Sequence, residues 1–175
     1  MLTIPTTIRD SINQNNGKVV LLSIKKQWLD KILAGEKTIE VRKTRPWEFE
    51  YPFTVLCYET KKEGGSGKIV AAFVCDSIKD LDCFTELPVI IDGTDMPTVT
   101  QEFCSKGCLS YKELYNYGRT SGRLYGWNVQ NVVPIDGTLQ DLHISRAPQS
   151  WRYCSLEVER CKIAAPTYSL TANTR

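Results

Sequence analysis

The stretch LLSIKKQWLDKILAGEKTIEVRKTR, residues 21–45, decides the fold of this chain because it joins a strand, a helix and a second strand. A largely apolar run over residues 19–24 predicts a buried strand. Apolar side chains then recur at helical spacing over residues 28–33, and Gly35 follows at the place where a helix ends. We therefore predict a strand, a short helix and a turn before the next strand begins.

The second strand is predicted over residues 37–43, KTIEVRK, where side chains alternate with the period of a strand. This alternation directs Ile39 and Val41 toward the core. It places Glu40 and Arg42 together on the opposite face. We therefore expect a pair of opposite charges on one face of this strand, close to the turn that follows the helix.

The pattern Gly-x-Lys-Thr-x-Glu-x-Arg over residues 35–42, just after an amphipathic helix, resembles the ASCH family. Two later segments, LYGWNV at 124–129 and APQSWRY at 147–153, also resemble bacterial and phage members. The resemblance implies a PUA-like open β-barrel over residues 18–160. It also implies recognition of RNA, of another single-stranded nucleic acid or of a modified nucleoside, with hydrolytic activity in some members.

The length of 175 residues favours one domain. We predict an α+β fold with a mostly antiparallel sheet and a few peripheral helices. Residues 1–17 and 161–175 lack a sustained period and are predicted to be tails. Residues 53–59 and 68–77 are predicted to be the two strands of a hairpin, with residues 61–67 at its tip. The pattern loosens over residues 80–122, where we predict an insertion-like lid with short helices near 98–105 and 110–117.

The charge of the whole chain does not favour a nucleic-acid partner, because 22 basic and 20 acidic residues leave only +2. The distribution of charge is more informative. Residues 25–45 hold seven basic and three acidic residues, a local excess of +4, so the remainder of the chain carries −2. This cluster has two interpretations, a solvated charged face or a face that binds phosphate.

Composition also bears on the compartment. No apolar run reaches the roughly 18–20 residues that a membrane span needs, and residues 1–17 have no signal-peptide core. The seven cysteines are an odd number, and several, such as Cys57 and Cys75, lie among apolar strand residues. We therefore expect a cytoplasmic protein with reduced thiols and no membrane partner, and a monomer, although the sequence leaves the oligomeric state open.

The residues that most often carry catalysis or metals are sparse. His143 is the single histidine, and no acidic or cysteine partner stands at a recognisable spacing from it, so a structural role is favoured over a Ser-His-Asp or Cys-His site. Cys104 and Cys108 lie one helical turn apart, but the second close pair of a zinc site is lacking. We predict no metal and no cofactor.

Lys37 is the strongest candidate for chemistry. A lysine at the junction of a helix end and a strand can bind phosphate as a point charge or, when desolvated, act as a base. Glu40 is close enough along the strand to influence it. The alternative is an ion-pair network of Glu40 and Arg42 that only stabilises the mouth of the barrel.

The ASCH resemblance adds two enzyme types to this interpretation. Members that release acyl groups from N4-acylated cytidine use a lysine at the position of Lys37 and a threonine three residues later, where this chain has Glu40. A carboxylate there would give a different intermediate from a hydroxyl nucleophile. Other members are ribonucleases that use a lysine, a tyrosine and a serine or threonine. Lys37 and Ser150 can be compared with the first and the last.

Aromatic side chains supply a second line of argument. Trp47 and Trp151 follow Arg-Pro and Ala-Pro-Gln-Ser, respectively, on loops beside predicted strands, where they can stack on bases. Core packing is the alternative role, and it is favoured for Trp127. We predict that Trp47 is exposed.

These considerations favour a binding module for RNA or a nucleotide, with a basic cleft built by residues 35–47 and 146–151. A hydrolase that uses Lys37 and Glu40 and a protein-interaction adaptor are the alternatives. The predicted catalytic residues are Lys37 and Glu40, and the predicted nucleic-acid-binding residues are Lys25, Arg42, Lys43, Arg45, Trp47, Arg146, Gln149, Ser150 and Trp151.

Overall fold

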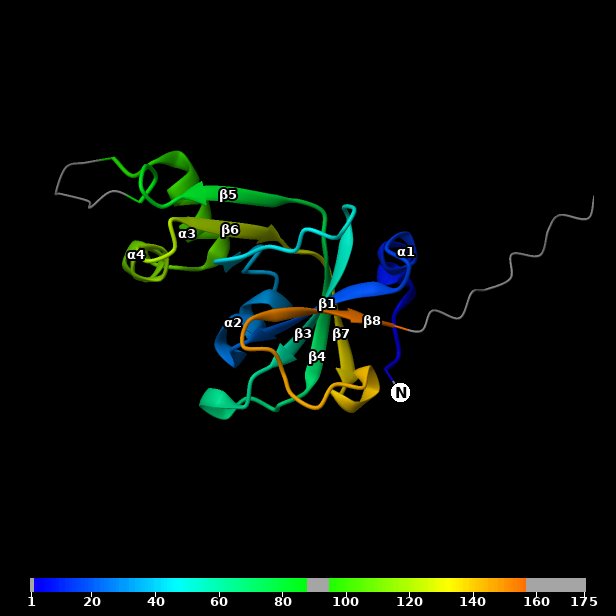
Figure 1. Cartoon of the computed structure of the whole chain (residues 1–175). Helices are drawn as coiled ribbons and strands as arrows, with labels where there is room; N and C mark the ends of the chain where they lie inside the picture. Colours follow the sequence, from blue (N-terminus) through cyan, green and yellow to red (C-terminus); the bar gives the residue numbers. More distant parts are fainter. Residues whose placement is uncertain (1, 88–94, 157–175) are drawn as a thin grey trace, which may run out of the picture.

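A computed structural model describes residues 2–87 and 95–156, which form two sheets and several helices (Figure 1). The larger sheet has five strands in the order β7-β4-β3-β1-β8. Its strands are β1 (Lys18–Ile24), β3 (Phe53–Glu59), β4 (Ile69–Cys75), β7 (Gln130–Gly137) and β8 (Trp151–Ser155). β1 and β3 run parallel, and the other neighbours run antiparallel.

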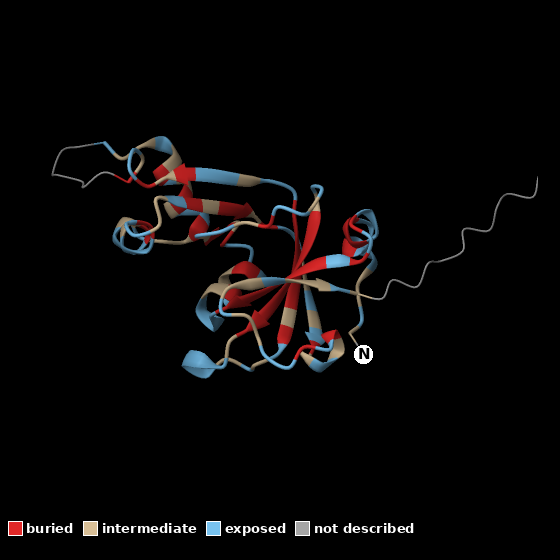
Figure 2. Cartoon of the chain, viewed as in Figure 1, coloured by how far each residue is buried: buried red, intermediate tan, exposed pale blue. Residues whose placement is uncertain are grey.

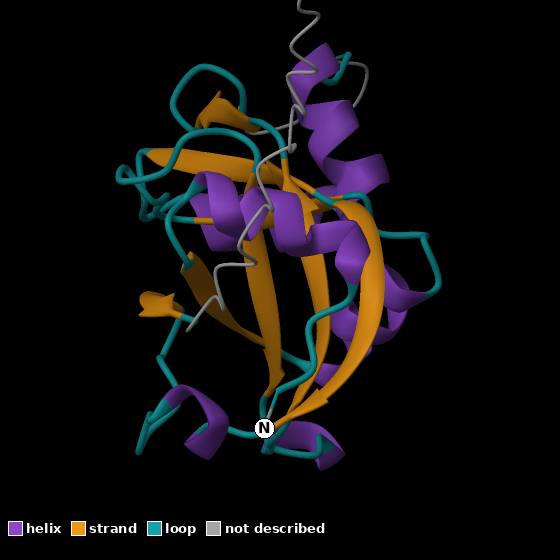
Figure 3. Cartoon of the chain, turned by 90° about the vertical axis from the view of Figure 1, so that its right-hand side faces the viewer, coloured by secondary structure: helices purple, strands orange, loops and turns teal. Residues whose placement is uncertain are grey.

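The smaller sheet has three antiparallel strands in the order β2-β6-β5. These are β2 (Ile39–Arg42), β5 (Ile78–Asp82) and β6 (Arg123–Asn128). The α-helices are α1 (Thr6–Gln14), α2 (Lys26–Leu33), α3 (Thr98–Gly107) and α4 (Tyr111–Gly118), with 3-10 turns η1 (Lys62–Gly64) and η2 (Gln140–Leu142). The strands curve strongly (Figure 3), but the described sheets do not close into a barrel.

The larger sheet is covered on both faces. Side chains on one face pack with α2 and with Trp127 from the smaller sheet, whereas those on the other face pack with α1 and η2. This explains why every residue of β3 is buried, as Figure 2 shows in red across the middle of the molecule. Trp127 is fully buried, which confirms its predicted place in the core.

Residues 6–14 correct the prediction of a tail over residues 1–17, because they form α1 and pack against the sheet. Ile8 and Ile12, one turn apart, are buried, and the Ser11 and Thr54 hydroxyls are 2.6 Å apart. The polar neighbours of these two isoleucines hide the short apolar stripe in the sequence. Residues 157–175 lie outside the described part of the chain, and the predicted C-terminal tail lies among them.

The described residues of the segment 80–122, expected to be an insertion-like lid, instead belong to a packed unit around the smaller sheet. The two predicted helices are present as α3 and α4, and they bury Phe103 and Leu114 against β2, β5 and β6. α4 begins with a capping box, in which Ser110 and Glu113 satisfy each other's backbone N–H groups. Gly126 lets this unit pack closely, since a Cβ there would lie 2.8 Å from the Phe103 ring.

Candidate functional site

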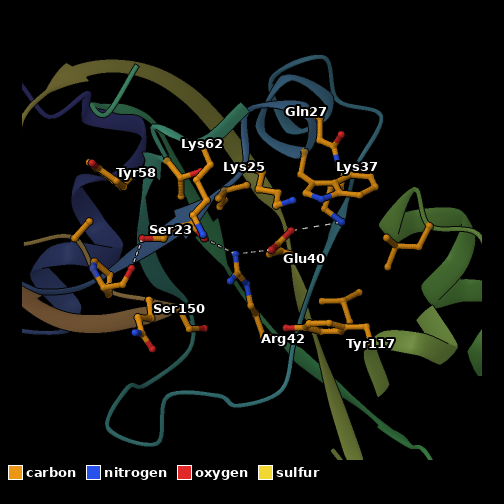
Figure 4. A pocket seen from close by; sticks show the side chains of 18 of the residues that line it. Ser23, Lys25, Gln27, Lys37, Glu40, Arg42, Tyr58, Lys62, Tyr117 and Ser150 are labelled. Atoms are coloured by element: carbon orange, nitrogen blue, oxygen red, sulfur yellow. Dashed lines mark hydrogen bonds and ion pairs between the residues drawn. The ribbon is translucent and has the colours of Figure 1, made fainter. Parts of the chain in front are cut away.

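A pocket of about 1150 Å³ opens between the two sheets (Figure 4). Four parts of the chain that are distant in sequence surround it: the end of β1 with α2, strand β2, the end of β3 with the turn after it, and α4. The segment 147–150 completes the wall. Its charged and polar lining residues are Ser23, Lys25, Gln27, Lys37, Glu40, Arg42, Tyr58, Thr60, Lys61, Lys62, Glu113, Asn116, Tyr117, Gln149 and Ser150.

The predicted charged pair of β2 lies in this pocket as part of a buried network. Glu40 is only 5 % exposed, and its two carboxylate oxygens lie 3.4 Å from Lys37 Nζ and 2.8 Å from a terminal nitrogen of Arg42. Ile39 and Val41 point the other way, into the core under α3, which confirms the predicted alternation. Because the Glu40 carboxylate is buried and has lost its hydration, it depends on the two cations to compensate its charge.

Lys37 is held in place from three sides. Its ammonium donates to the carbonyl oxygen of Gly107 at 2.6 Å, at the end of α3, and lies 5.3 Å from the centre of the Trp28 ring. Glu40 forms the third contact. The partial negative charge at the helix end, the carboxylate and the ring face all favour a cation at this point. Lys37 is 2 % exposed and is therefore a fixed hydrogen-bond donor at the pocket wall.

Arg42 connects this network to the other side of the pocket. Its guanidinium donates to the carbonyl oxygen of Ser23 at 2.8 Å. The Ser23 hydroxyl donates to the carbonyl oxygen of Pro148 at 2.7 Å, and the Ser23 N–H donates to the carbonyl oxygen of Ser150 at 2.9 Å. These bonds hold the segment 147–150 against β1, which is how Gln149 and Ser150 reach the wall.

Lysines surround the mouth of the pocket. Lys61 and Lys62 project from the turn after β3, and Lys25 precedes α2 with its ammonium 2.6 Å from Glu63. The turn is tied down because the buried Glu59 carboxylate accepts the N–H of Ser66. The lining therefore includes five basic and two acidic side chains: Lys25, Lys37, Arg42, Lys61 and Lys62 against Glu40 and Glu113.

Tyr117 of α4 forms the wall opposite α2. The Lys43 ammonium lies 4.9 Å from the centre of its ring. Burial raises the pKa of the Tyr117 phenol, and the charge of Arg42 opposes that rise while Glu40 adds to it. The phenol therefore stays protonated at neutral pH and can donate a hydrogen bond to a ligand.

The structure brings together six of the predicted site residues and leaves five outside the pocket. Those in the lining are Lys25, Lys37, Glu40, Arg42, Gln149 and Ser150, and those outside it are Lys43, Arg45, Trp47, Arg146 and Trp151. Lys37 and Ser150, which the family comparison pairs, lie on opposite sides of the Glu40–Arg42 contact in Figure 4. The sequence predicted a cleft built by residues 35–47 and 146–151. In the structure, α2, α4 and the turn after β3 also contribute to it.

Three of the residues outside the pocket have contacts elsewhere. Trp151 is half-buried, packs edge-on against Trp127, and donates its indole N–H to the Thr44 hydroxyl at 2.9 Å. Trp47 is 72 % exposed, which confirms the prediction. The guanidinium of Arg45 lies over the rings of Trp47 and Tyr125 and 3.5 Å from an Asp80 carboxylate oxygen, so these groups already contact it.

Several lining residues were missed by sequence reasoning. Lys61 and Lys62 appeared to be hairpin-tip charges, and Tyr117 and Trp28 to be ordinary helix residues. Nothing in their local spacing indicates a site, because they meet only through the packing of α2, α4 and the end of β3. Among the described residues, no three His, Cys, Asp or Glu side chains are grouped so that they could hold a metal ion. No helix of the described chain is long and apolar enough to cross a membrane.

Comparison with known proteins identifies the family of this chain. The family model described as the ASCH domain matches residues 22–162, which include the charged network and most of the pocket. The chain belongs to the ASCH domain family. A search of curated proteins gives no match.

Solved ASCH structures share the fold. An ASCH protein from Zymomonas mobilis is 16 % identical over 77 % of this chain and 85 % of that one, with a TM-score of 0.59. A serine-to-alanine mutant of the Z. mobilis protein has 16 % identity, covers 78 % and 88 %, and has a TM-score of 0.60. A tyrosine-to-phenylalanine mutant has 16 % identity, covers 77 % and 88 %, and has a TM-score of 0.59. At this identity the likeness concerns the fold alone.

Proposed function

We propose that this ASCH domain binds a nucleotide unit of single-stranded nucleic acid, with RNA favoured, in the pocket between its two sheets. One observation carries the proposal: the lining combines an excess of cations at its mouth with a buried, hydrogen-bonded Lys37–Glu40–Arg42 network at its wall. Mobile surface lysines suit phosphates as point charges, whereas a fixed carboxylate and fixed donors suit the polar edge of a base.

The geometry gives each part of such a ligand a place. Lys25, Lys61 and Lys62 at the mouth can meet phosphate oxygens. Trp28 and Tyr117, on α2 and α4, provide flat walls for a base. The Glu40 carboxylate can accept from an exocyclic amine, and Gln149 offers both a donor and an acceptor.

Salt dependence tests this assignment. We expect the affinity for a fluorescein-labelled single-stranded RNA, measured by anisotropy, to fall as salt rises, with a log-log slope of about −0.7 for each neutralised phosphate. The double change Lys61→Ala and Lys62→Ala makes the slope shallower by about 0.7 for each lost contact. Lys68→Ala is the matched control, because Lys68 pairs with Asp136 outside the pocket. A salt-independent affinity, or equal effects of the double variant and the control, would contradict the proposal and favour a protein-interaction role.

Hydrolysis of a modified nucleoside or of RNA is the second candidate function. It is favoured by the burial of Lys37 beside Glu40, because a desolvated donor and an adjacent carboxylate can stabilise an oxyanion and activate a water molecule. Glu40 stands where acylcytidine-releasing members have a threonine, so a general base replaces a hydroxyl nucleophile in this version of the reaction.

Turnover of N4-acetylcytidine and of RNA tests this second function. Lys37→Met is expected to abolish turnover, and circular dichroism of the same variant shows whether the fold survives. His143→Ala is the control, since His143 is exposed beyond η2 and does not line the pocket. If the wild-type protein turns over neither substrate, or His143→Ala is as inactive as Lys37→Met, the domain is a binding module only.

A further inference from the structure

Outside the pocket, Trp47 stacks with side chains that do not line the pocket. The Arg45 guanidinium lies 4.2 Å from the centre of the Trp47 ring and 5.3 Å from that of Tyr125. Arg45 is also 3.5 Å from an Asp80 carboxylate oxygen. One face of the Trp47 ring is thus covered by a held cation, and its 72 % exposure means that the remainder of the ring faces solvent.

The exposure of Trp47 does not come from an unanchored loop. The Trp47 N–H donates to the Tyr153 hydroxyl at 2.9 Å, and the Thr44 hydroxyl accepts from the Trp151 indole at 2.9 Å. Both bonds tie the loop after β2 to β8. A large ring on an anchored backbone loses little conformational entropy on binding, which is the property of a recognition residue.

The Trp47 stack, defined as Trp47, Arg45 and Tyr125, is continuous with the pocket. Tyr125 is paired directly with Arg42 across β6 and β2, and Arg42 lines the pocket. Lys43, the residue after Arg42, is exposed. Its ammonium lies over the ring of Tyr117, another lining residue. Arg42 thus lies at the border of the pocket and the stack, and Lys43 supplies an exposed cation beside the pocket wall.

We propose that Trp47 stacks on a second base of the strand whose first base occupies the pocket, so that the ligand is a strand and not a free nucleoside. Lys43 meets the phosphate between the two nucleotides. The pocket, at about 1150 Å³, has room for the first nucleotide. The inference rests on the proposed function, since it needs a nucleotide in the pocket.

The test compares ligands of one and several nucleotides. Dissociation constants are measured for adenosine and cytidine monophosphates and for a labelled six-nucleotide RNA, together with DNA of matched sequence. They are measured for the wild-type protein, Trp47→Ala and Phe84→Ala. Phe84 is the matched control, because it is an even more exposed aromatic residue, at 83 %, that does not line the pocket.

We expect Trp47→Ala to weaken the six-nucleotide strand about 5- to 150-fold, the range for loss of one stacked base, and to leave mononucleotide binding unchanged. Phe84→Ala should change neither. If Trp47→Ala binds the strand as the wild type does, or the strand binds no tighter than a mononucleotide, the inference is overturned while the proposed function stands. If the wild type binds neither ligand, both are overturned. A preference of the Trp47 contact for RNA over DNA would show that the sugar between the two bases is read as well.

Discussion

The two sheets of this domain differ in what their faces contact. The five-stranded sheet is buried on both faces at its central strands β1, β3 and β4, by α1 and η2 on one side and by α2 on the other. The three-stranded sheet buries one face under α3 and α4 and directs Glu40 and Arg42 on the other face into the pocket, with Tyr125 supporting Arg45 beside it. The larger sheet thus supplies stability, whereas the smaller one places its charges and rings where a ligand can reach them.

The larger and the smaller sheet should also differ in the reactivity of nearby cysteines. Burial raises the pKa of the Cys75 thiol, in the larger sheet, from 9.0 to about 12. At pH 8 this lowers its thiolate fraction about a thousandfold, and burial also blocks access of the reagent. Iodoacetamide labelling followed by mass spectrometry of the native protein should find Cys108, which follows α3, modified and Cys75 unmodified. Early modification of Cys75 would mean that the larger sheet opens as readily as the smaller.

The charged network should distinguish the pocket wall from ordinary protein surface. Glu40→Ala leaves Lys37 and Arg42 buried without their carboxylate, which we expect to lower the free energy of unfolding by about 3–5 kcal/mol. Urea denaturation measures it. Glu48→Ala is the control, because Glu48 pairs with Lys18 at the surface, where such a pair contributes about 0–1 kcal/mol. Equal effects of the two variants would mean that the pocket wall behaves as ordinary surface.

A smaller effect is expected at the cap of α4. Ser110→Ala removes the capping box and should cost about 1 kcal/mol. Hydrogen exchange of this variant measures the effect on each sheet. The amides of α4 should lose protection while those of β3 keep theirs. The hydroxyl of Ser110, and after it the Ser110 N–H, lowers the pKa of Glu113. The stabilisation from this cap is therefore present above the ordinary pKa of 4.5 and is lost as the pH falls through the lowered value. Uniform loss of protection would show that the two sheets unfold together.

Periodic patterns predicted the elements well where the contacts are local. The alternation of residues 37–43, the hairpin of β3 and β4 and the helices α3 and α4 could be read from spacing, because a side chain's face follows from its position in a regular backbone. α1 was missed since only two of its residues, Ile8 and Ile12, carry the apolar stripe.

The sequence was thus enough to predict the family, the mixed α and β elements and the charges that β2 presents. Only the packing of distant elements shows that the ends of β1 and β3 lie side by side through parallel pairing, that α4 brings Tyr117 opposite α2, and that Arg45 lies between two rings. This is because periodicity is a local property that records which face of an element is apolar, whereas a pocket depends on which distant elements meet. That choice is made by the summed burial of distant side chains, which no local spacing contains.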